Sequence, residues 1–140
     1  MITITRRLEW DAGHRVLGHE GRCRHIHGHR YVAEITVRAE KLDGIGRVID
    51  FSVVKTLVGG WIDTHWDHNL MLHPDDPQRL HLQETEDRPP YVMRDGNPTA
   101  ENIAEELGRN AIRLLADTGV EVVSVRIWET PNCHADWYNR

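Results

Sequence analysis

Histidine side chains gather near the start of this 140-residue chain and are its first candidates for chemistry. The chain has 10 histidines, and five of them lie between positions 14 and 29. His27 and His29 are two residues apart, so on an extended backbone both side chains point to the same side. Gly28 between them lets a ligand or another backbone come close. Because imidazole is the commonest protein ligand for metals, this spacing indicates a metal site.

His14 completes a set of three possible ligands if two predicted strands pair. Apolar and polar residues alternate over about 2–14 and again over about 29–40, which is typical of strands with one buried face. His14 continues the apolar face of the first strand, and His27 and His29 continue that of the second. A hairpin would bring three imidazoles to one end of a sheet. Three histidines with a free fourth position form a catalytic zinc arrangement, whereas the alternative is three surface histidines in a polar loop.

Cys23 lies four residues before His27 and has three possible roles. It could be the fourth ligand of a closed structural zinc site, a thiolate base beside the metal, or an inert buried cysteine. Spacing alone does not choose among them. The other cysteine, Cys133, stands beside His134 and is expected to be structural. Two cysteines form no disulfide framework, which favours a reduced, cytoplasmic protein.

Asp67 and His68 follow a predicted helix in a tryptophan-rich stretch. An aspartate that hydrogen-bonds a histidine can tune a neighbouring proton carrier. The pair also fits an ordinary turn at the C-terminal end of a helix, where histidine is common. Both interpretations stay open on these residues alone.

Glu129 ends a predicted strand on the apolar face that Val125 and Ile127 mark. A carboxylate on an apolar face needs a partner. Two adjacent N–H donors of an aminopyrimidinone ring would suit it, because a carboxylate can accept both side by side. The alternative is a glutamate exposed to water at the end of a strand.

The elements that must position these residues form one predicted domain, residues 1–140. Thr99 follows Pro98 as the N-cap of a helix, and Glu101 lies near the positive end of that helix. The expected elements are strands over 2–14 and 29–40, a helix over 51–65 after Asp50 as N-cap, a surface loop over 73–97, a helix from Thr99 to Gly119, a strand over 120–129 and a short strand around 137–138. Strands at both ends with helices between them predict an α+β fold, in which an antiparallel sheet carries two helices on one face.

Composition excludes several classes of protein. Hydrophobic residues make up 39% of the chain and charged residues 28%, which is typical of a globular rather than a disordered protein. A net charge of −5 without a basic block argues against nucleic acid or an anionic membrane as the main partner. No apolar run approaches the ~20 residues of a membrane span, and the N-terminus lacks the pattern of a signal peptide.

Several ordered motifs make the chain resemble the 6-pyruvoyl-tetrahydropterin synthase family almost from end to end. They are Trp10-Asp11-Ala12-Gly13-His14, Cys23-x-x-x-His27-Gly28-His29-x-Tyr31, Gly46-x-Val48-Ile49-Asp50-Phe51, Asp67-His68-x-Leu70, Pro98-Thr99-Ala100-Glu101-Asn102 and Glu129-Thr130. Three residues separate Cys23 from His27. That gap is similar to the branch of the family that forms 6-carboxytetrahydropterin in the queuosine (7-deazaguanine) pathway, since the 6-pyruvoyl branch has a longer gap there.

The resemblance implies a role for each candidate residue. The implied roles are zinc binding for His14, His27 and His29, proton abstraction for Cys23, proton relay for Asp67 and His68, and anchoring of the pterin ring for Glu129 with help from Thr99. His68 would act from a neighbouring subunit. The fold implied is the tunnelling fold, in which ββααββ protomers join into a barrel, as a homohexamer of two stacked trimers with shared active sites.

The reaction implied is the zinc-dependent conversion of 7,8-dihydroneopterin triphosphate to 6-carboxytetrahydropterin, acetaldehyde and triphosphate. Arg22, Arg24 and Arg30 are candidates for binding the triphosphate. Two alternatives within the family are formation of a 6-pyruvoyl product without side-chain cleavage and an activity like that of dihydroneopterin aldolase. An alternative from a different class is a non-catalytic, zinc-stabilised binding module in which Cys23 closes the metal site.

Overall fold

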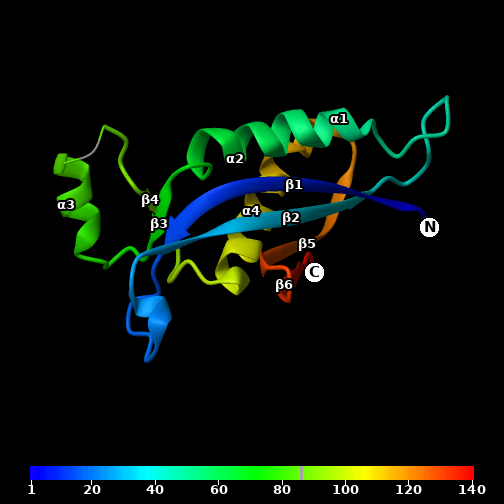
Figure 1. Ribbon diagram of the computed structural model, residues 1–140. Coiled ribbons are helices and arrows are strands. Elements are labelled where there is room, and N and C mark those ends of the chain that lie inside the picture. Colours follow the sequence, from blue (N-terminus) through cyan, green and yellow to red (C-terminus); the bar gives the residue numbers. More distant parts are fainter. Residues whose placement is uncertain (86) are drawn as a thin grey trace.

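A six-stranded sheet forms the centre of the computed structural model, which describes residues 1–85 and 87–140 (Figure 1). Its strands are β1 (Thr3–His14), β2 (His27–Arg38), β3 (Leu70–Leu72), β4 (Tyr91–Val92), β5 (Glu121–Thr130) and β6 (Cys133–Tyr138), in the spatial order β4-β3-β1-β2-β5-β6. The four long strands pair antiparallel, as predicted. The short β3 pairs parallel with both β1 and β4, so the complete sheet is mixed.

The first helical segment covers one side of β1 and matches the predicted range. It consists of α1 (Phe51–Val54), a π-helical turn (Lys55–Gly59) and α2 (Gly60–His65). Asp50 is its N-cap, because the Asp50 carboxylate accepts a hydrogen bond from the backbone N–H of Ser52. A Cβ added at Gly59 would lie 3.3 Å from Leu8 Cδ2, so glycine lets this helical turn pack closely on β1.

The second helix on the same face is α4 (Ala100–Leu114). Thr99 caps it as predicted, since the Thr99 hydroxyl accepts a hydrogen bond from the backbone N–H of Asn102. The α-helix ends earlier than predicted, and a 3₁₀ turn (Ala116–Thr118) leads on to Gly119. Gly119 has a φ of 83°, a conformation that glycine adopts at little cost and that ends the helical path.

The core lies between the sheet and these two helical segments. It contains the alternating apolar side chains of β1, β2 and β5 together with those of α2 and α4 that face them. Trp10 is at its centre and stacks on Tyr31 and on Trp66, with ring centroids 5.3 and 5.6 Å apart. The alternation that predicted the strands is therefore the pattern of side chains facing this core.

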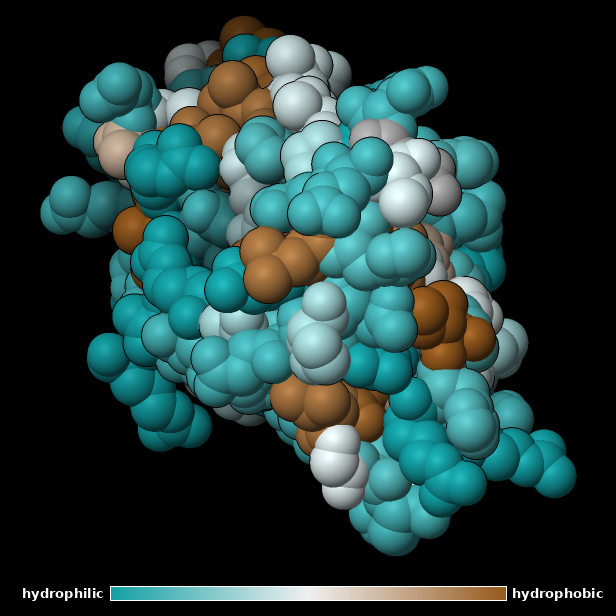
Figure 2. All heavy atoms as spheres, turned by 90° about the vertical axis from the view of Figure 1, so that its left-hand side faces the viewer, coloured by the Kyte–Doolittle hydropathy of each residue, from teal (hydrophilic) through white to brown (hydrophobic). Residues whose placement is uncertain are grey.

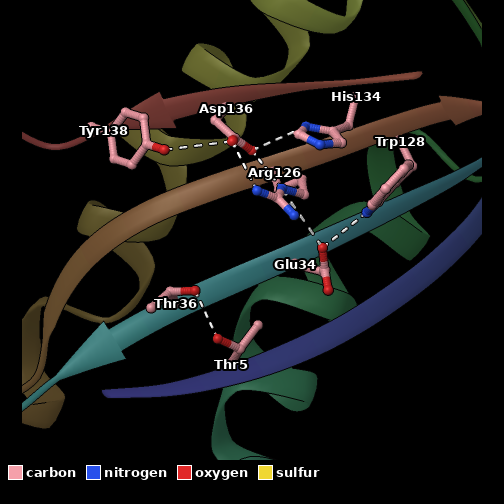
Figure 3. A network of polar contacts seen from close by, with 8 residues as sticks. All are labelled: Thr5, Glu34, Thr36, Arg126, Trp128, His134, Asp136 and Tyr138. Carbon is pink, nitrogen blue, oxygen red and sulfur yellow. Dashed lines mark hydrogen bonds and ion pairs between the residues drawn. The ribbon is translucent and has the colours of Figure 1, made fainter. Parts of the chain in front are cut away.

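The opposite face of the sheet is polar, and its side chains link neighbouring strands (Figure 3). Arg126 on β5 donates to both carboxylate oxygens of Asp136 on β6, at 2.7 and 3.0 Å. Trp128 Nε1 donates to the Glu34 carboxylate on β2 at 2.9 Å. These contacts connect three strands on a face that no helix of the described chain covers.

The segment predicted as a surface loop, 73–97, is more structured than expected. It contains α3 (Gln78–Thr85) as well as β4, and α3 lies at the left-hand end of Figure 1, apart from the other helices. None of the residues of α3 is buried, so no apolar stripe was available to reveal this helix by periodicity. Figure 2 views this end of the molecule and shows a largely hydrophilic surface with separate hydrophobic side chains. Among the described residues, no helix has the length and apolar character to cross a membrane.

Candidate metal centre

Three imidazoles converge at the end of the sheet where β1 finishes and β2 begins. The pairing register places His14 opposite His27 and Ala12 opposite His29. The three ring centroids are 4.6 to 5.1 Å apart, and one potential ligand atom from each ring lies within 4.8 Å of the others. A Cβ at Gly28 would lie 3.2 Å from the Ala12 carbonyl oxygen, so this glycine allows close approach of the two strands. The predicted hairpin therefore brings the three predicted ligands together.

Backbone carbonyls orient two of these rings. His14 Nδ1 donates to the Pro98 carbonyl at 2.7 Å, and His27 Nδ1 donates to the His25 carbonyl at 2.7 Å. With the proton on Nδ1, each ring presents the lone pair of Nε2 to the cluster. A histidine whose second nitrogen is held by a carbonyl in this way has the arrangement that metal-binding histidines share.

The free nitrogens fit a bound cation. The Nε2 atoms of His14 and His27 face each other at 3.1 Å, and neither has a proton left to donate. Two ligands about 2.0–2.1 Å from one tetrahedral zinc ion stand roughly 3.3 Å apart, which is close to this separation. His29 Nε2 is buried and has no hydrogen-bond partner within the described residues. The three nitrogens are therefore suited to holding one metal ion.

Burial favours the neutral form of two of these imidazoles, His14 and His29. It lowers the pKa of His14 to about 4; the hydrogen bond to Pro98 opposes that shift, whereas His27 and His29 add to it. Burial also lowers the pKa of His29, and the neighbouring Glu129 carboxylate partly offsets this effect. Neutral imidazole is the form that binds metals, so the site is prepared for a cation at neutral pH.

Glu129 faces the same cluster from β5. Its Oε1 lies 3.4 Å from His14 Nε2 and 3.9 Å from His29 Nε2. The Glu129 side chain is 27% exposed, so it is not the fully solvated strand-end glutamate that the sequence left as an alternative. An open hollow of about 650 Å³ borders His29 and Glu129, but it lies over the polar face of the sheet, where Glu34 and Trp128 also line it.

Cys23 lies beside the histidines but outside their cluster of ligand atoms. It is half-buried in a 3₁₀ turn, Arg22–Arg24, and its carbonyl accepts a hydrogen bond from the Val16 N–H at 2.7 Å. Burial raises the pKa of Tyr31, and the charges of Glu129 and Cys23 add to that effect. The group of close ligand atoms consists of His14, His27 and His29, and the structure does not bring Cys23 into it.

Asp67 and His68 form a pair at the turn after α2, away from the histidines. Asp67 Oδ1 accepts from the Asp11 N–H at 3.1 Å and lies 3.0 Å from His68 Nδ1. Burial opposes ionisation of Asp67, but these hydrogen bonds and the charges of His68 and Arg30 outweigh it and lower the Asp67 pKa. The His68 side chain is 75% exposed, and His68 has a left-handed φ of 55°, which is uncommon outside glycine. Neither side chain forms a hydrogen bond or ion pair with the histidine cluster in the described part of the chain.

The remaining candidates occupy the surroundings of the site. Arg22 and Arg24 are exposed on either side of Cys23, and Arg30 pairs with Asp11 at 3.1 Å. Cys133 is exposed on β6, while His134 Nδ1 lies 3.4 Å from Asp136 Oδ1, so neither belongs to the metal cluster.

Two contributors are absent from the sequence-based candidates. The Pro98 carbonyl orients His14, but a backbone carbonyl leaves no signature in a sequence. Asn97 binds the loop after β1 with its side chain, and its position directly before the Pro98-Thr99 cap was the available signal.

Comparison with known proteins assigns the chain to a family. The model of the family described as 6-pyruvoyl tetrahydropterin synthase matches residues 3–140. A 6-carboxy-5,6,7,8-tetrahydropterin synthase from Rickettsia typhi is 46% identical over 139 residues, which cover 97% of this chain and 99% of that protein. A probable 6-carboxy-5,6,7,8-tetrahydropterin synthase from Halobacterium salinarum is 33% identical over 126 residues, covering 90% of this chain and 79% of that protein.

Solved structures share the fold. An uncharacterized protein from Wolinella succinogenes superimposes with a TM-score of 0.85 at 24% identity, covering 99% of this chain and 98% of that one. The 6-pyruvoyl tetrahydropterin synthase of Caenorhabditis elegans does so with a TM-score of 0.72 at 22% identity, covering 99% of this chain and 96% of that one. The similarity in sequence extends over nearly the whole chain and includes the strands that carry the three histidines. This chain therefore belongs to the 6-pyruvoyl tetrahydropterin synthase family.

Proposed function

We propose that this protein is a 6-carboxytetrahydropterin synthase that depends on zinc. The observation that carries the proposal is the cluster of three histidines with free Nε2 atoms, with Glu129 beside it, in a chain whose nearly full-length relatives have that name. The substrate is 7,8-dihydroneopterin triphosphate. The products are 6-carboxytetrahydropterin, acetaldehyde and triphosphate, with one water consumed.

His14, His27 and His29 would hold the zinc ion. When bound there, zinc supplies Lewis-acid chemistry to the oxygens of the substrate side chain. The Pro98 and His25 carbonyls keep the proton of two rings on Nδ1, so the orientation of those rings does not depend on the metal. The protein thus offers a site whose ligand atoms are already aimed at one point.

Cys23 takes a proton from the substrate side chain in this proposal. A thiolate suits the role because it needs only to be close to the substrate, and Cys23 lies outside the cluster, in the loop that joins His14 to His27. Asp67 and His68 relay protons. Asp67 holds one ring nitrogen of His68 at 3.0 Å, which leaves the other nitrogen of this exposed ring free to exchange a proton.

Glu129 anchors the pterin ring, with help from Thr99. Its carboxylate lies beside the histidine cluster and can accept two N–H donors of the ring side by side. Glu129→Gln keeps the shape but places an NH₂ group opposite one donor. We expect weaker pterin binding and a severe loss of turnover with an unchanged zinc content, measured by ligand titration, steady-state kinetics and metal analysis. If this variant kept the wild-type affinity and rate, the result would contradict the proposed role of Glu129 in binding the ring.

The working form in this proposal is an oligomer of about six chains that share active sites. β4 and β6 are the two edges of the sheet, and an unpaired edge is usually covered or joined to another strand. His68 is exposed, and neither Asp67 nor His68 forms a hydrogen bond or ion pair with the histidine cluster of its own chain within the described residues. Joining sheets edge to edge would cover the edges and place this pair next to the Cys23 of a neighbouring chain.

The decisive experiment is incubation of the pure, zinc-loaded protein with 7,8-dihydroneopterin triphosphate, followed by identification of the pterin and the aldehyde. We expect 6-carboxytetrahydropterin and one equivalent of acetaldehyde. A 6-pyruvoyl product without acetaldehyde would support the 6-pyruvoyl branch instead. Equal turnover of dihydroneopterin without its triphosphate would support an aldolase-like activity, and absence of turnover by the zinc-loaded protein would support a binding module.

A further inference from the structure

Asn97 connects two parts of the candidate site that are far apart in the sequence. Its side chain accepts a hydrogen bond from the Leu17 N–H at 2.8 Å and donates one to the Leu17 carbonyl at 2.9 Å. The two bonds satisfy both backbone groups of a single residue in the loop after β1. An amide is the side chain that can do this, because it carries a donor and an acceptor side by side.

Leu17 belongs to the loop that carries Cys23. Its neighbour Val16 donates its N–H to the Cys23 carbonyl at 2.7 Å, which closes the loop from the end of β1 to the 3₁₀ turn at Cys23. Arg15, at the start of the loop, forms a two-bond ion pair with the buried Asp76. The loop is therefore fixed to the rest of the protein at Arg15 and at Leu17, and Asn97 supplies the second of these contacts.

Asn97 itself is held firmly at the start of α4. Its carbonyl accepts hydrogen bonds from Asn102 Nδ2 at 2.9 Å and from the Thr99 N–H at 2.8 Å. The next residue, Pro98, is buried and accepts the hydrogen bond of His14 Nδ1. Two adjacent residues thus control two groups: Pro98 orients a metal-binding histidine, and Asn97 holds the loop of the candidate base.

We propose that Asn97 is a positioning residue, which sets the place of Cys23 relative to the three histidines. This role rests on the proposed function, in which Cys23 is the base and the histidines bind zinc. Proton transfer from the substrate requires Cys23 at a fixed distance from the metal site, and a small displacement costs one to two orders of magnitude in rate. The hydrogen bonds of Asn97 resist that displacement without touching the substrate.

The test compares the reactivity of the two cysteines in metal-free protein. Cys23 is half-buried and Cys133 is exposed on β6, so the rate of alkylation of Cys133 by iodoacetamide is an internal reference. Asn97→Ala removes both bonds to Leu17 and leaves the Thr99 cap in place. We expect the ratio of the Cys23 rate to the Cys133 rate, measured by peptide mass spectrometry, to rise at least about fivefold, because loss of hydrogen bonds favours local opening of the loop.

Turnover of the zinc-loaded variant provides the second measurement. We expect kcat to fall about ten- to hundredfold and KM to stay within about twofold, since no group assigned to ring binding is changed. Asn139→Ala is the matched control: it removes an asparagine amide that donates to the Val122 carbonyl at 2.9 Å, far along the chain from the site. The control should change neither the alkylation ratio nor kcat.

The outcomes separate this proposal from the proposed function. Alkylation needs neither substrate nor zinc, so it is informative even if wild-type protein shows no synthase activity. An unchanged alkylation ratio in Asn97→Ala overturns the proposal, even where the melting temperature falls. If Asn97→Ala does not fold, Asn97→Asp is used instead. It keeps the acceptor for the Leu17 N–H but places an oxygen against the Leu17 carbonyl, and an unchanged ratio there has the same consequence.

Discussion

The histidine cluster and the Asp67–His68 turn both adjoin β1, yet they differ in how many of their side chains find partners within one chain. Each histidine of the cluster is enclosed or held, two of them by backbone carbonyls, and Glu129 faces them. The Asp67–His68 pair is ordered by Asp11, but its imidazole is directed to solvent. The difference indicates that the candidate metal site is assembled within one chain, whereas the Asp67–His68 pair would need a group from outside the chain to act as the proposed relay.

The largest expected effect tests the completeness of the metal site. His27→Ala removes one of the three imidazoles and leaves His14 and His29 with only the Glu129 carboxylate near them in the described chain. We expect a fall in zinc to well below a tenth of the wild-type content per chain, measured by elemental analysis after dialysis, together with loss of turnover. His25→Ala is the control, because His25 contributes only its carbonyl. Full zinc retention in His27→Ala would contradict the assignment of the ligands.

The next effect tests whether the relay is completed by a second chain. Cys23→Ala should keep its zinc and its fold and lose most activity, since Cys23 lies outside the histidine cluster and is the proposed base. His68→Ala should also be inactive. Mixing the two inactive proteins under conditions of subunit exchange should restore up to roughly a quarter of the wild-type rate, because some sites then combine an intact Cys23 with an intact His68. Zinc loss with a large drop in melting temperature in Cys23→Ala would support a closed structural site instead.

Measuring the oligomeric state of the wild-type protein gives a second test of whether active sites are shared between chains. We expect the wild-type protein to sediment as an assembly of about six chains. A monomer at working concentration would contradict both the edge-pairing and the shared-site explanations, whatever the mixing experiment shows.

A smaller effect tests the burial of the cluster through pH. Folding lowers the pKa of His14 from its ordinary value of 6.5 to about 4. Between these two pH values, His14 is protonated in the unfolded chain but not in the folded chain. The stability contributed by neutral His14 is fully present above pH 6.5 and is lost as the pH falls from 6.5 to 4. We expect metal-free protein to lose on the order of 3 kcal/mol of unfolding free energy over this range, measured by urea unfolding. His14→Asn should flatten the profile, and an unchanged slope would show that His14 does not carry it.

The smallest expected effect is a difference in unfolding free energy between variants of two tyrosines, Tyr31 and Tyr91. The Tyr31 hydroxyl is buried beside the histidines without a hydrogen-bond partner in the described residues, whereas the Tyr91 hydroxyl donates to the Glu106 carboxylate. Tyr31→Phe should leave the unfolding free energy unchanged or slightly higher, and Tyr91→Phe should lower it by about 1–3 kcal/mol. Calorimetry of the two variants checks this order. A loss of stability in Tyr31→Phe would show that its hydroxyl has a partner in solution.

Much of the fold follows from patterns that are local in the sequence. The alternation in β1 and β2 records which side chains face the core, and the Asp50 and Thr99 caps mark the starts of helices because each supplies an acceptor for free backbone N–H groups. The same alternation places His14, His27 and His29 on one face. These features were predictable because each depends on neighbours within a few residues.

The pieces without an apolar pattern were not predictable in the same way. α3 buries none of its residues, and β3 and β4 are three and two residues long, so none has a period to detect. Their pairing depends on contacts with distant segments. The Pro98 carbonyl and the Asn97 amide act on residues about 80 positions away, at 2.7 to 2.9 Å, and that proximity exists only in the folded chain.

The sequence alone determined which three histidines cluster as candidate metal ligands, which two strands carry them and which residues cap both covering helices. It could do so because residue type, parity and capping each depend on a short stretch of sequence. Only the tertiary structure decided that Nε2 is the free nitrogen of His14 and His27, that Cys23 lies outside the histidine cluster, and that the His68 imidazole is exposed to solvent. Those decisions depend on which backbone carbonyl or side chain meets each group after the sheet has closed on its helices. These contacts are made between residues far apart in the sequence and depend on packing across the whole domain. They therefore cannot be predicted from a short stretch of residues.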